Sequence, residues 1–277
     1  MQRRCFLSQK RKSSSKGCAS CTMYLRLWSL PEAKELFTYQ KGWIQIGDRP
    51  AYRVETLSLD PIESLPVELW HGRSFQLLFE IIRRHGSEIR DLAPQAVYIG
   101  SARGELHALV EGIQAYLAGE KLSPKLSPAT SMGSLGSTLA RHLGIEGPAV
   151  VISQTCLSGL LALYEATLYI HAGEGHTTLF GAVEAPLTPF FVEVMAAMRI
   201  YTQREQPPFV RPGAATEENT FALGEGAVLG ILSQSPISPF RLAKVKVRTA
   251  MPREGVSFPA VDTEALVKLL RDMGAAP

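Results

Sequence analysis

The sequence predicts an α/β layered fold built around a buried sheet. Stretches with strand patterns alternate along the chain with stretches of helical spacing, and several of the helical stretches are apolar on every side. Of the 277 residues, 45% are hydrophobic, which is enough for a large domain with a real core. No apolar run reaches the ~18 residues of a membrane span, so we expect a soluble protein.

Six segments have the alternation or the short apolar run that is typical of a strand. The predicted strands are 23–29, 96–100, 149–154, 178–183, 227–232 and 241–248. Apolar positions at helical spacing predict helices between them, at 74–84, 105–117, 132–144, 158–171, 191–198 and 263–273. The stretch 38–63 is rich in turn residues, a proline-spaced loop leads to Thr130, and 211–225 is predicted to be a polar loop.

The basic character of the chain comes from its first residues. The net charge is +3, but residues 1–17 hold six Lys or Arg and no acid. We interpret 1–22 as a basic, disordered leader, or as the product of a start codon placed before Met23, and 23–277 as the folded domain. Binding of a polyanion or a targeting role is the alternative for the leader. Nucleic-acid binding has no support elsewhere in the chain.

The four cysteines do not form a disulfide framework or a complete zinc motif. Cys18 and Cys21 make one C-x-x-C within the leader, beside Cys5, and no second pair follows. The folded part holds only Cys156, which is typical of a protein of the reducing cytoplasm. No phosphate-binding glycine motif occurs either, so neither a metal nor another cofactor is implied.

Cys156 lies where an apolar strand passes directly into an apolar helix, in V-V-I-S-Q-T-C-L-S-G at 150–159. This arrangement predicts a sharp turn that presents the thiol at the N-terminus of the helix. Unpaired amides and the helix dipole there favour a thiolate and can stabilise an oxyanion, so Cys156 is a candidate acyl acceptor. The alternative is a plain buried cysteine that acts as a small hydrophobic residue.

A second segment, Arg211-Pro212 followed by F-A-L-G-E-G-A at 221–227, makes the pattern specific. Together with T-C-L-S-G, and in this order along the chain, it resembles the β-ketoacyl synthases of fatty-acid and polyketide synthesis. The small-residue helix from Ser131 and G-A-V-E at 181–184 fit the same order. The resemblance covers roughly 96–233. It implies a thiolase-like layered fold, with the first half-fold complete and the second half truncated.

The resemblance also implies roles for particular residues. Cys156 matches the nucleophile that takes an acyl chain from acyl carrier protein or coenzyme A, and its backbone amide matches one oxyanion donor. Gly224, Glu225 and Gly226 match a loop that packs against the active-site face, with a structural role expected for all three.

Condensing members of this family also use two histidines that follow the G-E-G segment, and the last histidine here is His176. We therefore expect transfer onto Cys156 without autonomous carbon–carbon bond formation. Residue type alone makes His142 and His176 candidates to replace these two histidines. Glu184 follows a predicted strand, and either a place near the site or a surface or dimer role is compatible with that.

The resemblance further implies a dimer, either a homodimer or a heterodimer with a complete ketosynthase, with the apolar helices 158–171 and 191–198 suited to such packing. Two other interpretations remain open at this point. The chain is a non-catalytic partner of the chain-length-factor kind, with an inert thiol, or it is a gene fragment. Retention of Cys156 counts against a purely structural role.

Overall fold

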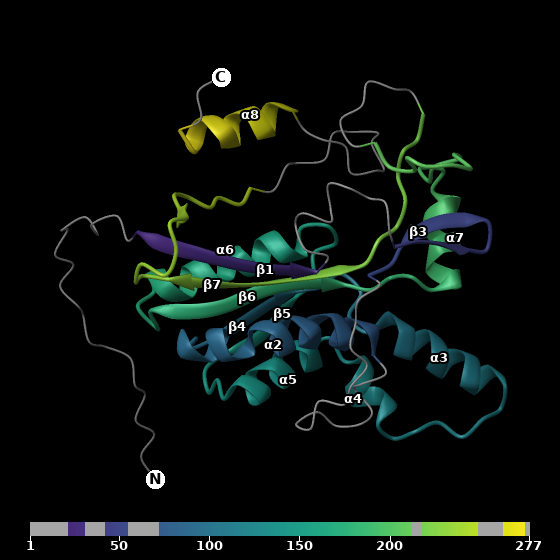
Figure 1. Cartoon of the computed structure of the whole chain (residues 1–277), viewed down its shortest axis with the longest axis horizontal. Coiled ribbons are helices and arrows are strands. Elements are labelled where there is room, and N and C mark those ends of the chain that lie inside the picture. The colour runs from purple at the N-terminus through teal and green to yellow at the C-terminus, as the bar shows by residue number, and fades with distance from the viewer. Residues whose placement is uncertain (1–21, 31–41, 55–71, 212–217, 249–262, 275–277) are drawn as a thin grey trace, which may run out of the picture.

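The computed structural model describes residues 22–30, 42–54, 72–211, 218–248 and 263–274 (Figure 1). The leader predicted at 1–22 lies almost wholly outside these ranges, with Cys5, Cys18 and Cys21, so the division into leader and domain stays a prediction. Among the described residues, no helix combines the length and the hydropathy needed to cross a bilayer.

A six-stranded mixed sheet with the order β5-β4-β6-β7-β1-β8 forms the centre of the fold. β4 lies parallel to both β5 and β6, whereas β7 pairs antiparallel with β6 and β1. Its strands are β1 (Met23–Leu30), β4 (Val97–Gly100), β5 (Ala149–Ile152), β6 (Thr177–Glu184), β7 (Gly226–Ser233) and β8 (Arg241–Leu242). A separate hairpin is formed by β2 (Trp43–Ile46) and β3 (Arg49–Tyr52).

Helices cover both faces of the sheet (Figure 1). α2 and α5 pack on one face around a large apolar core that includes Phe75, Leu139 and Leu229. α6 packs on the other face, against β4, β5 and β6, and its small residues Ala162 and Ala166 let it lie close to the sheet. The helices are α2 (Arg73–Asp91), α3 (Leu106–Leu117), α4 (Leu126–Thr130), α5 (Gly133–Leu143), α6 (Ser158–His171), α7 (Pro189–Ala197) and α8 (Thr263–Asp272).

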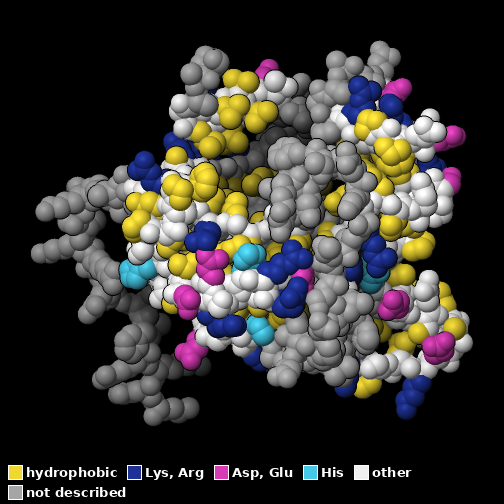
Figure 2. Space-filling model, in the orientation of Figure 1, with side chains coloured by type: hydrophobic (Ala, Val, Ile, Leu, Met, Phe, Trp, Pro, Cys, Tyr) yellow, Lys and Arg dark blue, Asp and Glu magenta, His cyan; other side chains and the backbone are white. Residues whose placement is uncertain are grey.

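α8 meets the rest of the chain through polar contacts at its C-terminal end. Lys244 Nζ donates a hydrogen bond to the carbonyl oxygen of Asp272, and Lys246 lies 3.7 Å from the Asp272 carboxylate. None of the helix's residues is buried, and Leu266 and Leu270 are exposed. Figure 2 shows hydrophobic side chains gathered over this helix at the upper left of the molecule.

Most predicted elements are confirmed, and four predictions were wrong in part. The helix expected at 74–84 runs from Arg73 to Asp91. The strand expected at 241–248 ends at Leu242, because Leu242 pairs with Met23, the first residue of β1, and no described strand lies beyond it to continue the pairing. The turn-rich stretch 38–63 contains the β2–β3 hairpin, whose tight turn includes Gly47 at φ +63°. The proline-spaced loop before Thr130 contains the short helix α4.

Candidate functional site

Cys156 lies on a sharp turn between the end of β5 at Ile152 and the first residue of α6, Ser158. Thr155, immediately before it, has φ +48°, in the left-handed region that a β-branched residue rarely adopts. The Cys156 side chain is exposed, so the alternative of a plain buried cysteine is wrong. The strand-to-helix turn expected from the sequence is present.

The side chain of Ser158 holds this turn closed. Its hydroxyl accepts a hydrogen bond from the Gln154 amide at 2.8 Å and donates one to the Thr155 carbonyl at 2.7 Å. Because Ser158 is buried whereas Gln154 and Thr155 are exposed, both bonds are partly shielded from competing water. Residues 153–157 are exposed, so the turn presents its thiol to the surface while its base stays anchored.

The end of β4 packs against both sides of the Cys156 turn. A Cβ added at Gly100 would come within 2.3 Å of the Ser158 carbonyl carbon and 2.5 Å of the Gly159 nitrogen. On the other side of the turn, the Ser101 amide donates a hydrogen bond to the Ile152 carbonyl at 3.0 Å. The absence of a side chain at Gly100 therefore lets the start of α6 approach the sheet.

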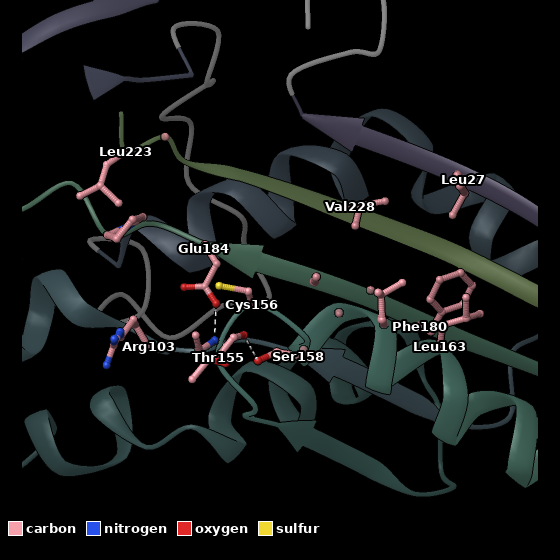
Figure 3. Close-up of a pocket in the computed structure, with 18 of the residues that line it drawn as sticks. Leu27, Arg103, Thr155, Cys156, Ser158, Leu163, Phe180, Glu184, Leu223 and Val228 are labelled. Carbon is pink, nitrogen blue, oxygen red and sulfur yellow. Dashed lines mark hydrogen bonds between the residues drawn. The ribbon is translucent and has the colours of Figure 1, made fainter. Parts of the chain in front are cut away.

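Cys156 opens onto an apolar groove of about 660 Å³ along the face of the sheet that α6 covers only in part (Figure 3). Alternation along the strands explains the lining, since Phe180, Ala182 and Glu184 share one face of β6, and Leu179 and Val183 share the other. β1 and β7 contribute Leu25, Leu27 and Val228, and α6 contributes Leu160 and Leu163.

Glu184 and Arg103 are the charged residues of this groove. Burial raises the pKa of the Glu184 carboxyl, and this effect outweighs the hydrogen bond that the carboxylate accepts from the Ala102 amide and the attraction of Arg103. The guanidinium of Arg103 lies 4.8 Å from the centre of the Phe191 ring, at cation–π distance. Of the two places left open for Glu184 by the sequence, the groove beside Cys156 is the one that the structure shows.

The segment of Gly224, Glu225 and Gly226 leads into β7, which begins at Gly226. Gly224 lines the groove, whereas Glu225 extends into a buried ion pair with Arg73 at the start of α2. Arg73 Nε lies 3.0 Å and 3.1 Å from the two Glu225 carboxylate oxygens, and the Val54 amide donates to the same carboxylate at 2.9 Å. This geometry supports the packing role that the resemblance implies for the loop.

A second buried carboxylate, Glu105, caps the N-terminus of α2. It accepts hydrogen bonds from the amides of Arg73 at 3.0 Å and Ser74 at 2.9 Å, two donors that lack partners within the helix. Burial raises the pKa of Glu105 to about 7, because the cost of desolvating the charged form exceeds the gain from the amide bonds.

The raised pKa of Glu105 predicts a pH-dependent stability. A carboxyl group whose folded pKa is above its unfolded value stabilises the fold fully below about pH 4.5, and this contribution is lost as pH rises through about 7. We expect the Glu105→Gln variant, which keeps one oxygen acceptor, to lack this decline, with a difference in slope of up to about 1.4 kcal/mol per pH unit. Urea unfolding of both proteins between pH 4.5 and 7.5 measures it.

Comparing the wild type with Glu105→Gln cancels the stability contributions of groups whose effect changes with pH in the opposite direction from that of Glu105. Burial lowers the pKa of His107 and His142, so their contribution rises with pH through their unfolded value near 6.5 in both proteins. Parallel stability curves for the wild type and Glu105→Gln would contradict the prediction.

The two histidines considered as substitutes lie away from the groove. The His142 ring packs edge-on against Phe79 at 5.2 Å, and His176 Nδ1 lies 2.6 Å from the Gln234 side-chain oxygen. Among the described residues, no histidine lines the groove.

Sequence reasoning missed Arg73, Ala102 and Glu105. The one local signal was for Glu105, an acidic residue at the start of a predicted helix, and it caps a different helix from its own. Arg73 meets a residue 152 positions away, and Ala102 takes part through its backbone alone, so neither leaves a pattern in the sequence.

Comparison with known proteins shows the family to which this chain is similar. The sequence profile of the family described as "Beta-ketoacyl synthase, N-terminal domain" matches residues 75–235. The 3-oxoacyl-[acyl-carrier-protein] synthase 2 of Vibrio cholerae is 28% identical over 152 residues, which are 54% of this chain and 37% of the relative. The chloroplastic 3-oxoacyl-[acyl-carrier-protein] synthase I of Arabidopsis thaliana is 32% identical over 143 residues, 50% of this chain and 30% of the relative.

Solved structures share the fold. A chain of the complex between a ketosynthase and its chain length factor from Xenorhabdus doucetiae matches with a TM-score of 0.60 and 18% identity, over 78% of this chain and 58% of that one. A chain of the complex between a type II polyketide acyl carrier protein and its ketosynthase matches with a TM-score of 0.52 and 19% identity, over 67% of this chain and 47% of that one. The predicted α/β ketosynthase-like fold is therefore confirmed over this part of the chain.

Proposed function

The chain belongs to the β-ketoacyl synthase family through its N-terminal domain, and on that premise we propose that Cys156 accepts an acyl chain from a thioester of acyl carrier protein or coenzyme A. The observation that carries the proposal is the position of Cys156, exposed at the N-terminus of α6 and at the side of an apolar groove. The reaction is the loading step of fatty-acid or polyketide synthesis, and the cysteine usage favours a cytoplasmic setting.

The chemistry is a transfer between two thiols. The Cys156 thiolate attacks the thioester carbonyl, a new carbon–sulfur bond forms, and the tetrahedral oxyanion collapses as the carrier thiolate leaves and takes up a proton. No oxidant or reductant is needed. The dipole of α6 favours both the attacking thiolate and the developing oxyanion, for which the Cys156 amide is the proposed donor.

The groove supplies the binding energy for the acyl chain. Leu27, Phe180 and Val228 offer apolar surface along the groove, and an alkyl chain that enters gains about 0.8 kcal/mol for each methylene removed from water. When an acyl chain is bound, a packing role remains the proposal for Gly224, Glu225 and Gly226. The Arg73–Glu225 ion pair supports this role, and Gly224 lines the groove.

A non-catalytic partner of the chain-length-factor kind is the second candidate. It is suggested by the solved complex of a ketosynthase with its chain length factor, a chain of which shares the fold of this protein. In that case the chain pairs with a complete ketosynthase, as a homodimeric or heterodimeric assembly of the family kind, and its thiol is inert. The reactivity of Cys156 separates the two candidates.

The test is intact-protein mass spectrometry after incubation with acyl-carrier and acyl-CoA thioesters of several chain lengths. We expect an acyl mass increment on the wild type that is lost in Cys156→Ala. A variant in which Cys5, Cys18 and Cys21 are all replaced by alanine is the matched control, because it keeps Cys156 and removes the other thiols. It should keep the increment in full.

Two outcomes would reject acyl acceptance by Cys156. The first is an increment that persists in Cys156→Ala and disappears in the triple variant. The second is a folded wild type that takes up no acyl group from any donor and does not react with a mild alkylating agent, which would favour the chain-length-factor-like role.

A further inference from the structure

The turn that follows β4, residues 101–104, lies between the end of β6 and the Cys156 turn. We propose that Glu184, at the end of β6, is a positioning residue that holds the Cys156 turn in place through the backbone of Ala102. This inference rests on the proposed acyl acceptance by Cys156 and names a residue on which that step depends.

The first link joins Glu184 to Ala102. The alternation of β6 places the Glu184 side chain on the groove face, where its carboxylate accepts a hydrogen bond from the Ala102 amide (Figure 3). Glu184 is half-buried, so this charged acceptor is partly shielded from water and a bond to it is stronger than one between neutral groups. The carboxylate thereby sets the position of the first residues after β4.

The second link joins the same turn to the nucleophile. The Ala102 carbonyl accepts a hydrogen bond from the Ser153 hydroxyl at 3.3 Å, and the neighbouring Ser101 amide donates to the Ile152 carbonyl at 3.0 Å. Both partners lie within four residues of Cys156. Gly100, on the other side, is in close contact with Ser158 and Gly159 at the start of α6. A shift of residues 100–102 therefore shifts both ends of the Cys156 turn.

The far end of the 101–104 turn is tied to α2. The Gly104 amide donates to the Ser101 hydroxyl at 3.0 Å, and the Ser74 hydroxyl donates to the Gly104 carbonyl at 2.8 Å. Ala102 is held from the groove side by Glu184. The Glu184 carboxylate also hydrogen-bonds with the Ser101 side chain, so its removal frees both residues that contact the Cys156 turn, while Gly104 stays tied to α2 through Ser74.

A purely electrostatic role for Glu184 predicts the opposite result. A negative charge near a thiol opposes the formation of thiolate, so removing the charge alone would move the pH midpoint of thiol alkylation to lower values. Loss of position would take the thiol away from the α6 N-terminus and move the midpoint to higher values. The direction in which the pH midpoint of alkylation moves therefore distinguishes the two roles.

The experiment compares Glu184→Ala with Glu184→Gln, whose amide oxygen can still accept the Ala102 hydrogen bond. We expect Glu184→Ala to slow single-turnover acylation of Cys156 by about tenfold or more and to move the alkylation midpoint with iodoacetamide to higher pH. Glu184→Gln should be acylated at a rate within about threefold of the wild type, and its alkylation midpoint should lie within about 0.5 pH unit of the wild-type value. A thermal melt of each variant excludes global unfolding as the cause.

The link through Ser153 is tested by a double-mutant cycle. Ser153→Ala should slow acylation or alkylation by a larger factor in the wild type than in Glu184→Ala, because the two residues act on one turn. Ser137→Ala is the matched control, since its exposed hydroxyl donates to Gly133 within α5, and it should add the same factor, close to one, in both backgrounds.

Several results would overturn the positioning role. They are a shift of the alkylation midpoint to lower pH in both Glu184 variants, an equal loss of rate in Glu184→Ala and Glu184→Gln, or an equal factor for Ser153→Ala in both backgrounds. Alkylation does not require acyl transfer. If the wild type takes up no acyl group but is alkylated, the proposed function fails and the alkylation data still decide the role of Glu184. A Cys156 thiol that also resists alkylation would overturn both proposals.

Discussion

Replacement of Glu225 by alanine is expected to lower the free energy of unfolding by about 3–5 kcal/mol, as for other buried ion pairs that lose one partner. The variant leaves the Arg73 guanidinium buried without its countercharge and the Val54 amide without its acceptor. The pair joins the start of α2 to the loop that precedes β7, so its loss weakens the contact between two layers of the fold. Urea denaturation monitored by circular dichroism measures the change.

Two further variants sharpen this prediction. Glu218→Ala breaks an exposed ion pair with Arg204 and should cost only about 0–1 kcal/mol. The double variant Arg73→Met with Glu225→Leu should recover part of the stability lost in Glu225→Ala, because it replaces the buried charges by apolar side chains. A loss in Glu225→Ala no larger than that in Glu218→Ala would show that the buried pair does not hold the layers together.

Gly100→Ala is expected to destabilise the fold by about 2–3 kcal/mol and to slow acylation of Cys156. The new methyl group would come within 2.3–2.5 Å of backbone atoms of Ser158 and Gly159, which cannot move aside as a flexible side chain can. The strain is relieved when the start of α6 moves away from the sheet, and the Cys156 turn moves with it. Thermal denaturation and single-turnover acylation measure the two effects.

The matched control is Gly133→Ala. Gly133 begins α5, and an added Cβ there meets no atom within 4 Å, so alanine should be neutral or should stabilise the helix by up to about 1 kcal/mol. If Gly100→Ala behaves like Gly133→Ala, the close approach of β4 to α6 does not position the nucleophile.

The sequence predicted best those elements whose pattern is local and regular. The bounds of α6, 158–171, follow from an almost wholly apolar stretch between two turn signals. α5 ends before Gly144, which takes φ +71° as a helix C-terminal glycine does. The strand at 241–248 failed because alternation there has another cause. The alternating Lys244, Lys246 and Arg248 meet Asp272 of α8 rather than a neighbouring strand.

The candidate site also combines features that were predictable from local sequence with features that were not. Cys156 was predictable because the strand, the turn and the helix that present it lie within about twenty consecutive residues. The apolar groove was not, since it combines side chains of β1, β6, β7 and α6 whose shared face is decided by strand order and register. A one-residue change of register would turn Phe180 and Glu184 to the opposite face of the sheet.

By itself, the sequence determined the order and type of most elements, the family and the thiol that we propose as nucleophile, because these depend on residues that are neighbours along the chain. Only the tertiary structure decided that Glu225 pairs with Arg73, that Glu105 caps α2, and that Glu184 reaches Ala102. These contacts join residues 32 to 152 positions apart, and burial gives them their strength, since a charged group away from water must find its partner within the fold.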